Sequence, residues 1–199
     1  MPNVMSKIMT LEAQATKAEV MDRLGEQGYP TYAHLLDKFA LHLTEDPEVI
    51  AYMVPDKGII VLNRFLSLNQ VSTIVRHEIL HQYLEHGKRE LAELGLKDIQ
   101  ELQDASIHEL SNIAADYEIS NKGYTERDKR IARAIRLNGQ TLKGLVTEDD
   151  HEDWLDLSYE EMFKKLREER KQNGSESNQA KQQDQIGSKV MLKSKKQKV

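Results

Sequence analysis

The apolar-rich stretch between Ser67 and Gly87, which no proline interrupts, predicts the helix around which the chain is organised. Ser67 followed by Gln70 forms a capping-box start, and Gly87 is a typical residue just beyond a helix C-terminus. The apolar residues of this segment spread around most of the helix circumference, as they do in buried helices: Leu68, Val71, Ile74, Val75, Ile79, Leu80 and Leu84. The pattern therefore predicts one buried, uninterrupted helix over residues 67–87.

Shorter apolar patterns predict the elements on either side of this helix. Two β-branched runs, 48–54 and 59–63, flank a Pro-Asp-x-Gly turn and predict a β-hairpin. Ser158 and Glu161 form a second capping box, which predicts a helix that ends near Glu169. Apolar positions at helical spacing predict helices over residues 8–25 and 31–43. We also expect a charged helix at 88–94, a further segment at 97–103, a helix at 107–121 and a basic helical stretch at 127–137. The predicted fold class is α+β: a mainly helical domain with a small hairpin or sheet beside the central helix.

The composition changes after Lys171, where Gln, Ser, Asn, Gly and Lys replace the apolar residues. Such a segment cannot bury enough apolar surface to fold, so we expect a domain over residues 1–170 and a disordered basic tail over 171–199. Weak contact of the Lys-rich end with phosphate is the alternative to a purely solubilising role. Residues 122–157 otherwise look irregular, and the acidic run at 148–153 predicts a solvated loop.

Charge and cysteine content restrict the classes of function. The 199 residues carry a formal net charge of −5, which argues against general nucleic-acid binding by the folded part. No cysteine is present, so any zinc must be held by histidine and carboxylate ligands. The N-terminus lacks the apolar core of a secretory signal, and no apolar run is long enough to cross a bilayer. We therefore expect a cytoplasmic protein without membrane contact, located in the host cytoplasm or the virion if a phage encodes it.

The central helix carries His77, Glu78 and His81 in the pattern His-Glu-x-x-His. At about 100° per residue the two histidines lie roughly 40° apart and one turn apart, so both rings can reach one metal ion. Glu78 lies beside them, where its carboxylate can accept a proton from a metal-bound water. Two histidines hydrogen-bonded in a core are the alternative interpretation. A buried imidazole or charge needs a partner, however, and a metal ion supplies one.

A catalytic zinc usually has three protein ligands, and the sequence offers several candidates for the third. In a straight helix His86 points about 180° away from the first histidine, so we expect it to pack near the helix end. Asp116 is the better candidate because it lies on a separate predicted helix beside two alanines. Glu118 lies about 200° round from Asp116, so only one of these two acidic residues can be the ligand. His108 and Glu109 remain weaker alternatives.

Two blocks of the sequence together resemble a known family: His77-Glu78-x-x-His81-x-x-Leu84-x-His86 and Asn112-Ile113-Ala114-Ala115-Asp116-Tyr117-x-Ile119-x-Asn121. They are similar to the Putative metallopeptidase domain that is often found ahead of a von Willebrand A-type domain. Bacteria and phages also carry stand-alone versions, which this chain resembles. With a similar closing segment at Gly144–Leu166, the resemblance covers roughly residues 30–167. It implies a zincin-like α+β fold in which His77, His81 and Asp116 bind Zn²⁺ and Glu78 is the catalytic base.

The first functional hypothesis is a zinc-dependent metallopeptidase that hydrolyses a peptide bond in a protein or peptide substrate. The alternative is a catalytically inactive, metal-stabilised binding module for a protein or nucleic-acid partner. A structural zinc would be closed by a fourth protein ligand such as His86 or His108, whereas a catalytic zinc keeps an open position. A third hypothesis, a nucleic-acid accessory protein that contacts phosphate through residues 127–136 and the Lys-rich end, is disfavoured by the acidic net charge.

Overall fold

The computed structural model describes residues 4–54, 57–98, 101, 104–137, 140–141 and 146–176. This part of the chain is mainly helical and contains a small three-stranded sheet, which confirms the predicted α+β class. It divides into two compact units. Residues up to Leu80 together with Ala134–Thr141 belong to the first unit, and His81–Arg133 together with residues 146–176 belong to the second.

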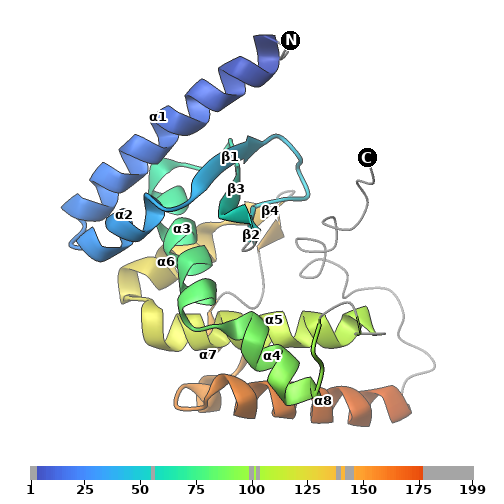
Figure 1. Ribbon diagram of the computed structural model, residues 1–199. Coiled ribbons are helices and arrows are strands. Elements are labelled where there is room, and N and C mark those ends of the chain that lie inside the picture. The colour runs from blue at the N-terminus through green and yellow to red at the C-terminus, as the bar shows by residue number, and fades with distance from the viewer. Residues whose placement is uncertain are drawn as a thin grey trace. The chain divides into compact units, whose positions relative to one another are not determined.

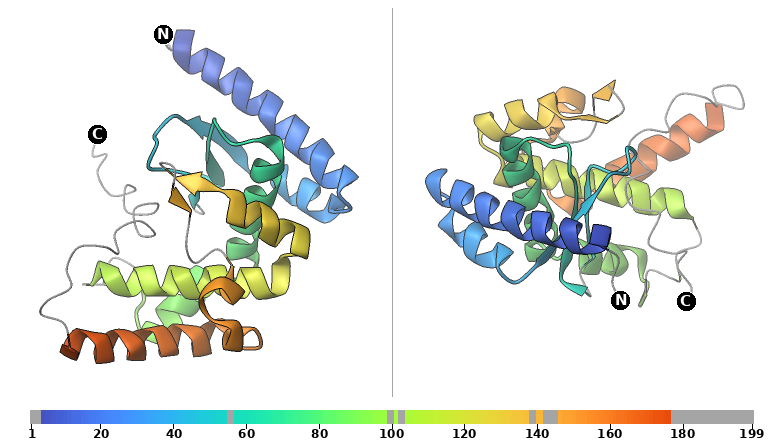
Figure 2. Two further views of the ribbon diagram at one scale, coloured as in Figure 1. Left: turned by 180° about the vertical axis from the view of Figure 1, so that it is seen from behind. Right: turned by 90° about the horizontal axis from the view of Figure 1, so that it is seen from above.

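Two helices open the first unit: α1 (Val4–Glu26) and α2 (Pro30–Leu36), which lie side by side (Figures 1 and 2). α1 confirms the helix predicted for residues 8–25 and extends it at both ends. The turn between the two helices contains Gly28 with φ +83°, a conformation that glycine adopts without strain. Pro30 then begins α2, where its missing N–H removes no helical hydrogen bond.

The helix predicted over residues 31–43 is wrong in its second half. α2 ends at Leu36, and the chain continues as strand β1 (Ala40–Thr44). The pattern misled because Leu41 and Leu43 fit the two-residue period of a strand as well as a helical stripe. Pairing with a distant strand, β3 (Ile59–Asn63), decides between the two structures.

The three-stranded sheet has the order β1-β3-β2, so β3 is the central strand. β2 (Ala51–Val54) pairs with β3 in antiparallel register, which confirms the predicted hairpin, although Pro55 and Asp56 of its turn lie outside the described residues. β1 pairs with β3 in parallel register. Ile60 and Leu62 of the central strand are fully buried, as expected for a strand paired on both sides.

The central helix, α3 (Leu68–Tyr83), begins where the sequence predicts. The Ser67 backbone N–H donates to Gln70 Oε1 at 2.9 Å and the Gln70 N–H lies 3.4 Å from Ser67 Oγ, so the capping box forms. Every residue from Val71 to Leu80 is buried, which confirms the predicted burial.

The predicted end of this helix at Gly87 is wrong. Glu85 adopts a left-handed backbone conformation with φ 54°, and a new helix, α4 (His86–Leu94), begins directly after it. Gly87 therefore lies inside α4, and Gly95, with φ 66°, ends that helix as expected. A left-handed conformation at a glutamate is uncommon, so nothing in the local sequence marks this break.

The core of the second unit lies between α5 (Ala105–Gly123) and α8 (Tyr159–Glu176), which pack against each other (Figure 1). The two alanines of the Ala-Ala-Asp block are buried in this core, where small side chains allow close packing. The buried cluster comprises Ala114, Ala115, Tyr117, Trp154, Tyr159, Met162, Phe163 and Leu166. The Ser158 capping box forms, and α8 continues beyond its predicted end to Glu176. The rest of the expected tail, 177–199, lies outside the described residues.

The segment expected to look irregular, 122–157, contains more structure than its pattern indicates. The basic helix α6 (Glu126–Ala134) is shorter than predicted. The acidic run is a short helix and a 3₁₀ turn rather than a simple loop, and Asp149 within it pairs with Arg133 at 2.8 Å. The short elements are β4 (Arg136–Leu137), β5 (Gln140–Thr141), α7 (Thr147–Asp150) and the 3₁₀ helix Glu152–Trp154. Within the described ranges, no helix has the length and hydrophobicity needed to span a bilayer.

Candidate metal centre

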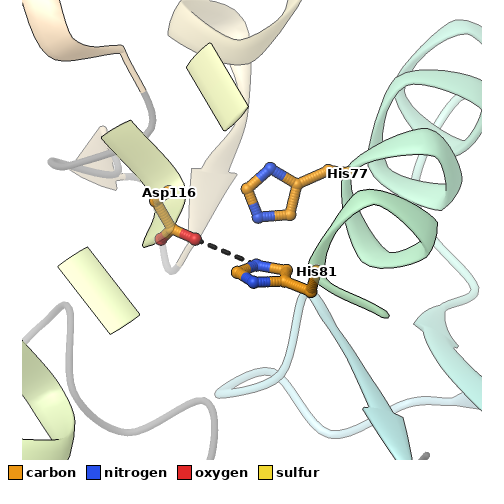
Figure 3. Close-up of side chains that lie close together, drawn as sticks. All are labelled: His77, His81 and Asp116. Atoms are coloured by element: carbon orange, nitrogen blue, oxygen red, sulfur yellow. Dashed lines mark ion pairs between the residues drawn. The ribbon is translucent and has the colours of Figure 1, made fainter. Parts of the chain in front are cut away.

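The two histidines of the His-Glu-x-x-His pattern lie one turn apart on α3 and project from the same side of it (Figure 3). His77 is 7% exposed and Glu78 is 6% exposed, so these groups are largely removed from water. The side chain of His81 retains 15% exposure. Helix geometry places the Glu78 side chain about 60° round the helix axis from His81 and about 100° from His77.

Asp116 is the acidic side chain that reaches this pair of histidines. It projects from α5, next to the two buried alanines. Its Oδ1 lies 3.1 Å from His81 Nε2, the contact drawn in Figure 3. Asp116 follows His81 by 35 positions in the sequence, so its position depends on how the second unit folds.

His77, His81 and Asp116 each offer one ligand atom, and these atoms all lie within 4.8 Å of one another. Two ligands of one tetrahedral ion with bonds of about 2.0 Å are separated by about 3.3 Å, close to the 3.1 Å between His81 Nε2 and Asp116 Oδ1. Two imidazole nitrogens and a carboxylate oxygen are donors that divalent transition ions accept. The residues present therefore fit a divalent metal ion.

Glu118, the other acidic candidate on α5, does not belong to this group, in agreement with the prediction that only one of the two acidic residues can be the ligand. Its side chain has no exposed surface and accepts hydrogen bonds from Arg89 Nη1 and Lys122 Nζ, both at 2.6 Å. Burial alone would raise the pKa of Glu118, but hydrogen bonds from His86, Arg89 and Lys122 hold it well below its ordinary value. Glu118 is thus the centre of a buried ion-pair cluster.

His86 lies close to the metal centre, because the break at Glu85 turns the chain before α4. Its Nδ1 is 3.1 Å from His81 Nδ1, and its Nε2 is 2.8 Å from Glu118 Oε2. Burial lowers the pKa of His86, and the hydrogen bond with Glu118 opposes that change. The expectation that His86 merely packs near the end of a straight helix misses this contact, since it assumes that α3 continues to Gly87.

The remaining candidates for a third ligand do not join the group. His108 Nδ1 lies 2.8 Å from the buried carboxylate of Glu90, in a separate pair within the second unit. Among the residues that the structure describes, neither His108 nor Glu109 belongs to a cluster that could hold a metal ion.

Comparison with known proteins places the chain in a family. A family model described as Putative metallopeptidase domain matches residues 18–197, which include all three members of the candidate metal centre. No curated protein and no solved structure matches the chain. Because the match spans most of the sequence, the chain belongs to the Putative metallopeptidase domain family.

Proposed function

We propose that this chain is a zinc-dependent peptidase in which His77, His81 and Asp116 hold the ion and Glu78 is the general base. The observation that carries the proposal is the convergence of three donor atoms, two of them from a His-Glu-x-x-His helix, within 4.8 Å. Membership of a metallopeptidase family supports the same chemistry.

A zinc ion held by these side chains would acidify a water molecule to a pKa near 7 and polarise the carbonyl of the bond to be cleaved. Glu78 directly follows His77 on α3, so its carboxylate would be able to reach that water and accept a proton from it. The same carboxyl group would then donate the proton to the amine that leaves. Its burial keeps bulk water from competing for these transfers.

The hydrogen-bond partners of His86 and His108, the two candidates for a fourth ligand, support a catalytic rather than a closed structural site. Both ring nitrogens of His86 have partners, His81 and Glu118, and the His108 ring is directed to Glu90. Three protein ligands leave one position for water, which is the arrangement of catalytic zinc sites. The nitrogen-plus-carboxylate donor set favours zinc over the alkaline-earth ions, which prefer oxygen ligands.

The substrate class that we propose is a protein or an extended peptide. The test is the Glu78→Gln variant, assayed on denatured casein and on a mixed peptide library whose products are read by mass spectrometry. We expect Glu78→Gln to bind zinc as the wild type does and to lose about 10²–10⁴-fold in cleavage rate, because only the proton acceptor is removed. Glu93→Gln, on the exposed side of α4, is the matched control and should cleave normally.

Cleavage by Glu78→Gln at the wild-type rate would overturn the assignment of the base. Wild-type protein that binds zinc but cleaves no member of the library would favour the alternative of a metal-stabilised binding module.

A further inference from the structure

The contact of His81 Nδ1 with His86 indicates that a residue outside the ligand set positions a ligand of the candidate metal centre. We infer that His86 is a positioning residue, which accepts a hydrogen bond from His81 Nδ1 and so presents His81 Nε2 to the metal ion. The chain of contacts runs from Glu118 through His86 to His81. This inference rests on the ligand set of the proposed function, but its test is metal binding and not catalysis.

The direction of the hydrogen bonds between Glu118 and His81 follows from the Glu118 carboxylate, which can only accept when it is ionised. The ionised carboxylate of Glu118 accepts from His86 Nε2, so that nitrogen carries the proton. A neutral His86 then has an unprotonated Nδ1, which accepts the Nδ1 proton of His81 across 3.1 Å. With its proton on Nδ1, a neutral His81 would direct the lone pair of Nε2, the nitrogen 3.1 Å from Asp116 Oδ1, to a metal ion bound by both residues. The contacts with His86 and Glu118 thus favour the tautomer of His81 that can bind a metal ion, whereas without an ion the Asp116 carboxylate favours a proton on Nε2 instead.

The Glu118 end of this series of contacts is held rigidly. Glu118 is fully buried and also accepts hydrogen bonds from Arg89 Nη1 and Lys122 Nζ. His86 is 5% exposed, and its ring lies 5.4 Å from that of Tyr159. A histidine ligand whose second nitrogen is fixed in this way is oriented before the ion arrives, which raises metal affinity.

The backbone supports the same role. Glu85 adopts φ 54°, a conformation that a glutamate rarely takes without compensation from its surroundings. The result is that His86, the next residue, turns toward His81 instead of continuing along α3. The strained residue, Glu85, therefore immediately precedes His86 and turns the chain so that the His86 side chain contacts His81.

Two substitutions of His86 separate positioning of His81 from simple support of the fold. The amide oxygen of His86→Asn lies where Nδ1 lay, so it can still accept from His81 but does not reach Glu118. The amide nitrogen of His86→Gln lies where Nε2 lay, so it can still donate to Glu118 but offers no acceptor at the Nδ1 position. His108→Ala is the control, because it removes another histidine–carboxylate pair of the same unit that does not contact the metal centre.

The measurement is the dissociation constant for Zn²⁺, obtained by competition with a chromogenic chelator at one fixed pH. We expect His86→Gln to weaken zinc binding about 10–100-fold, as loss of an outer hydrogen-bond partner does, and His86→Asn to stay close to wild type. His108→Ala should bind zinc as the wild type does. Long-range ¹H–¹⁵N spectra of the zinc-loaded wild type should show a slowly exchanging proton on His81 Nδ1, and this proton should exchange rapidly in His86→Gln.

The opposite order of affinities, with His86→Asn weak and His86→Gln normal, would overturn the inference, because it would mean that His86 only supports Glu118. Unchanged affinity in both variants would overturn it as well. A wild type that binds zinc and responds to these substitutions, yet cleaves no peptide, would uphold the inference while the proposed peptidase function fails. A wild type that binds no zinc would overturn both.

Discussion

The carboxylate of Glu118 is fully buried, and three groups that can carry positive charge converge on it, so its neutralisation is expected to destabilise the second unit strongly. Glu118 Oε2 lies 2.6 Å from Arg89 Nη1 and 2.8 Å from His86 Nε2, and Oε1 lies 2.6 Å from Lys122 Nζ. The Glu118→Gln variant keeps the shape of the side chain and removes its charge.

The expected magnitude follows from what each partner retains after the substitution. Removing one member of a buried ion pair typically costs about 3–5 kcal/mol, because the partner charge is left without compensation. Arg89 still donates to Glu160 at 2.6 and 2.8 Å, and the side chain of Lys122 is 56% exposed, so water can solvate it. We therefore expect a loss at the lower end of that range, about 3 kcal/mol in the free energy of unfolding.

The assay is equilibrium urea unfolding followed by circular dichroism, with a chelator present so that metal binding does not contribute. For an m-value of about 2 kcal/mol/M, the loss should lower the midpoint by about 1.5 M urea. Glu160→Gln is the matched control, because it removes the other carboxylate bound to Arg89, whose side chain is 36% exposed. An exposed pair of this kind contributes about 0–1 kcal/mol, so the two variants should differ clearly.

A Glu118→Gln variant that loses no more stability than Glu160→Gln would refute this reasoning. It would mean that the interactions of the buried Glu118 carboxylate contribute no more to the free energy of unfolding than those of the more exposed Glu160 carboxylate.

Three further predictions concern pH, metal and backbone strain. The hydrogen bonds from Arg89 lower the pKa of Glu160 below its ordinary 4.5, so the unfolded chain takes up this proton first. The stability advantage of wild type over Glu160→Gln should thus be complete above pH 4.5 and shrink as the pH falls through the lowered pKa, as urea unfolding at several pH values will show. Zinc at about 100 times its dissociation constant should stabilise wild type by about 2.7 kcal/mol and His81→Ala hardly at all, and equal thermal shifts in calorimetry would contradict the candidate site. Glu85→Gly should raise the free energy of unfolding by about 0.5–1 kcal/mol, because glycine adopts φ 54° without strain, and a loss of stability would contradict that account.

Features that depend on neighbours in sequence were predicted well. Ser67 and Ser158 mark helix starts because a capping box is formed by residues three positions apart. The hairpin formed by β2 and β3 follows from two β-branched runs around a short turn. The shared face of His77 and His81 follows from the α-helical repeat alone, so the sequence identifies these two candidate ligands without knowledge of the fold.

Features that depend on distant contacts were decided by the tertiary structure. Residues 40–44 carry a pattern compatible with helix or strand, and parallel pairing with β3 selects the strand. The break at Glu85 has no local signal, and the contacts of His86 with His81 and Glu118 show what the break achieves.

The third member of the candidate metal centre, Asp116, illustrates the same limit. Sequence reasoning favoured Asp116 but left Glu118, His86, His108 and Glu109 as alternatives, because helix periodicity relates residues within one helix and not between helices. The packing of the second unit brings Asp116 to within 3.1 Å of His81 and buries Glu118 in an ion-pair cluster on another side of α5. Local periodicity thus determined that His77 and His81 share one face of α3. Only the packing of the second unit decided which carboxylate lies next to His81, because that choice depends on distances in space that no short-range pattern encodes.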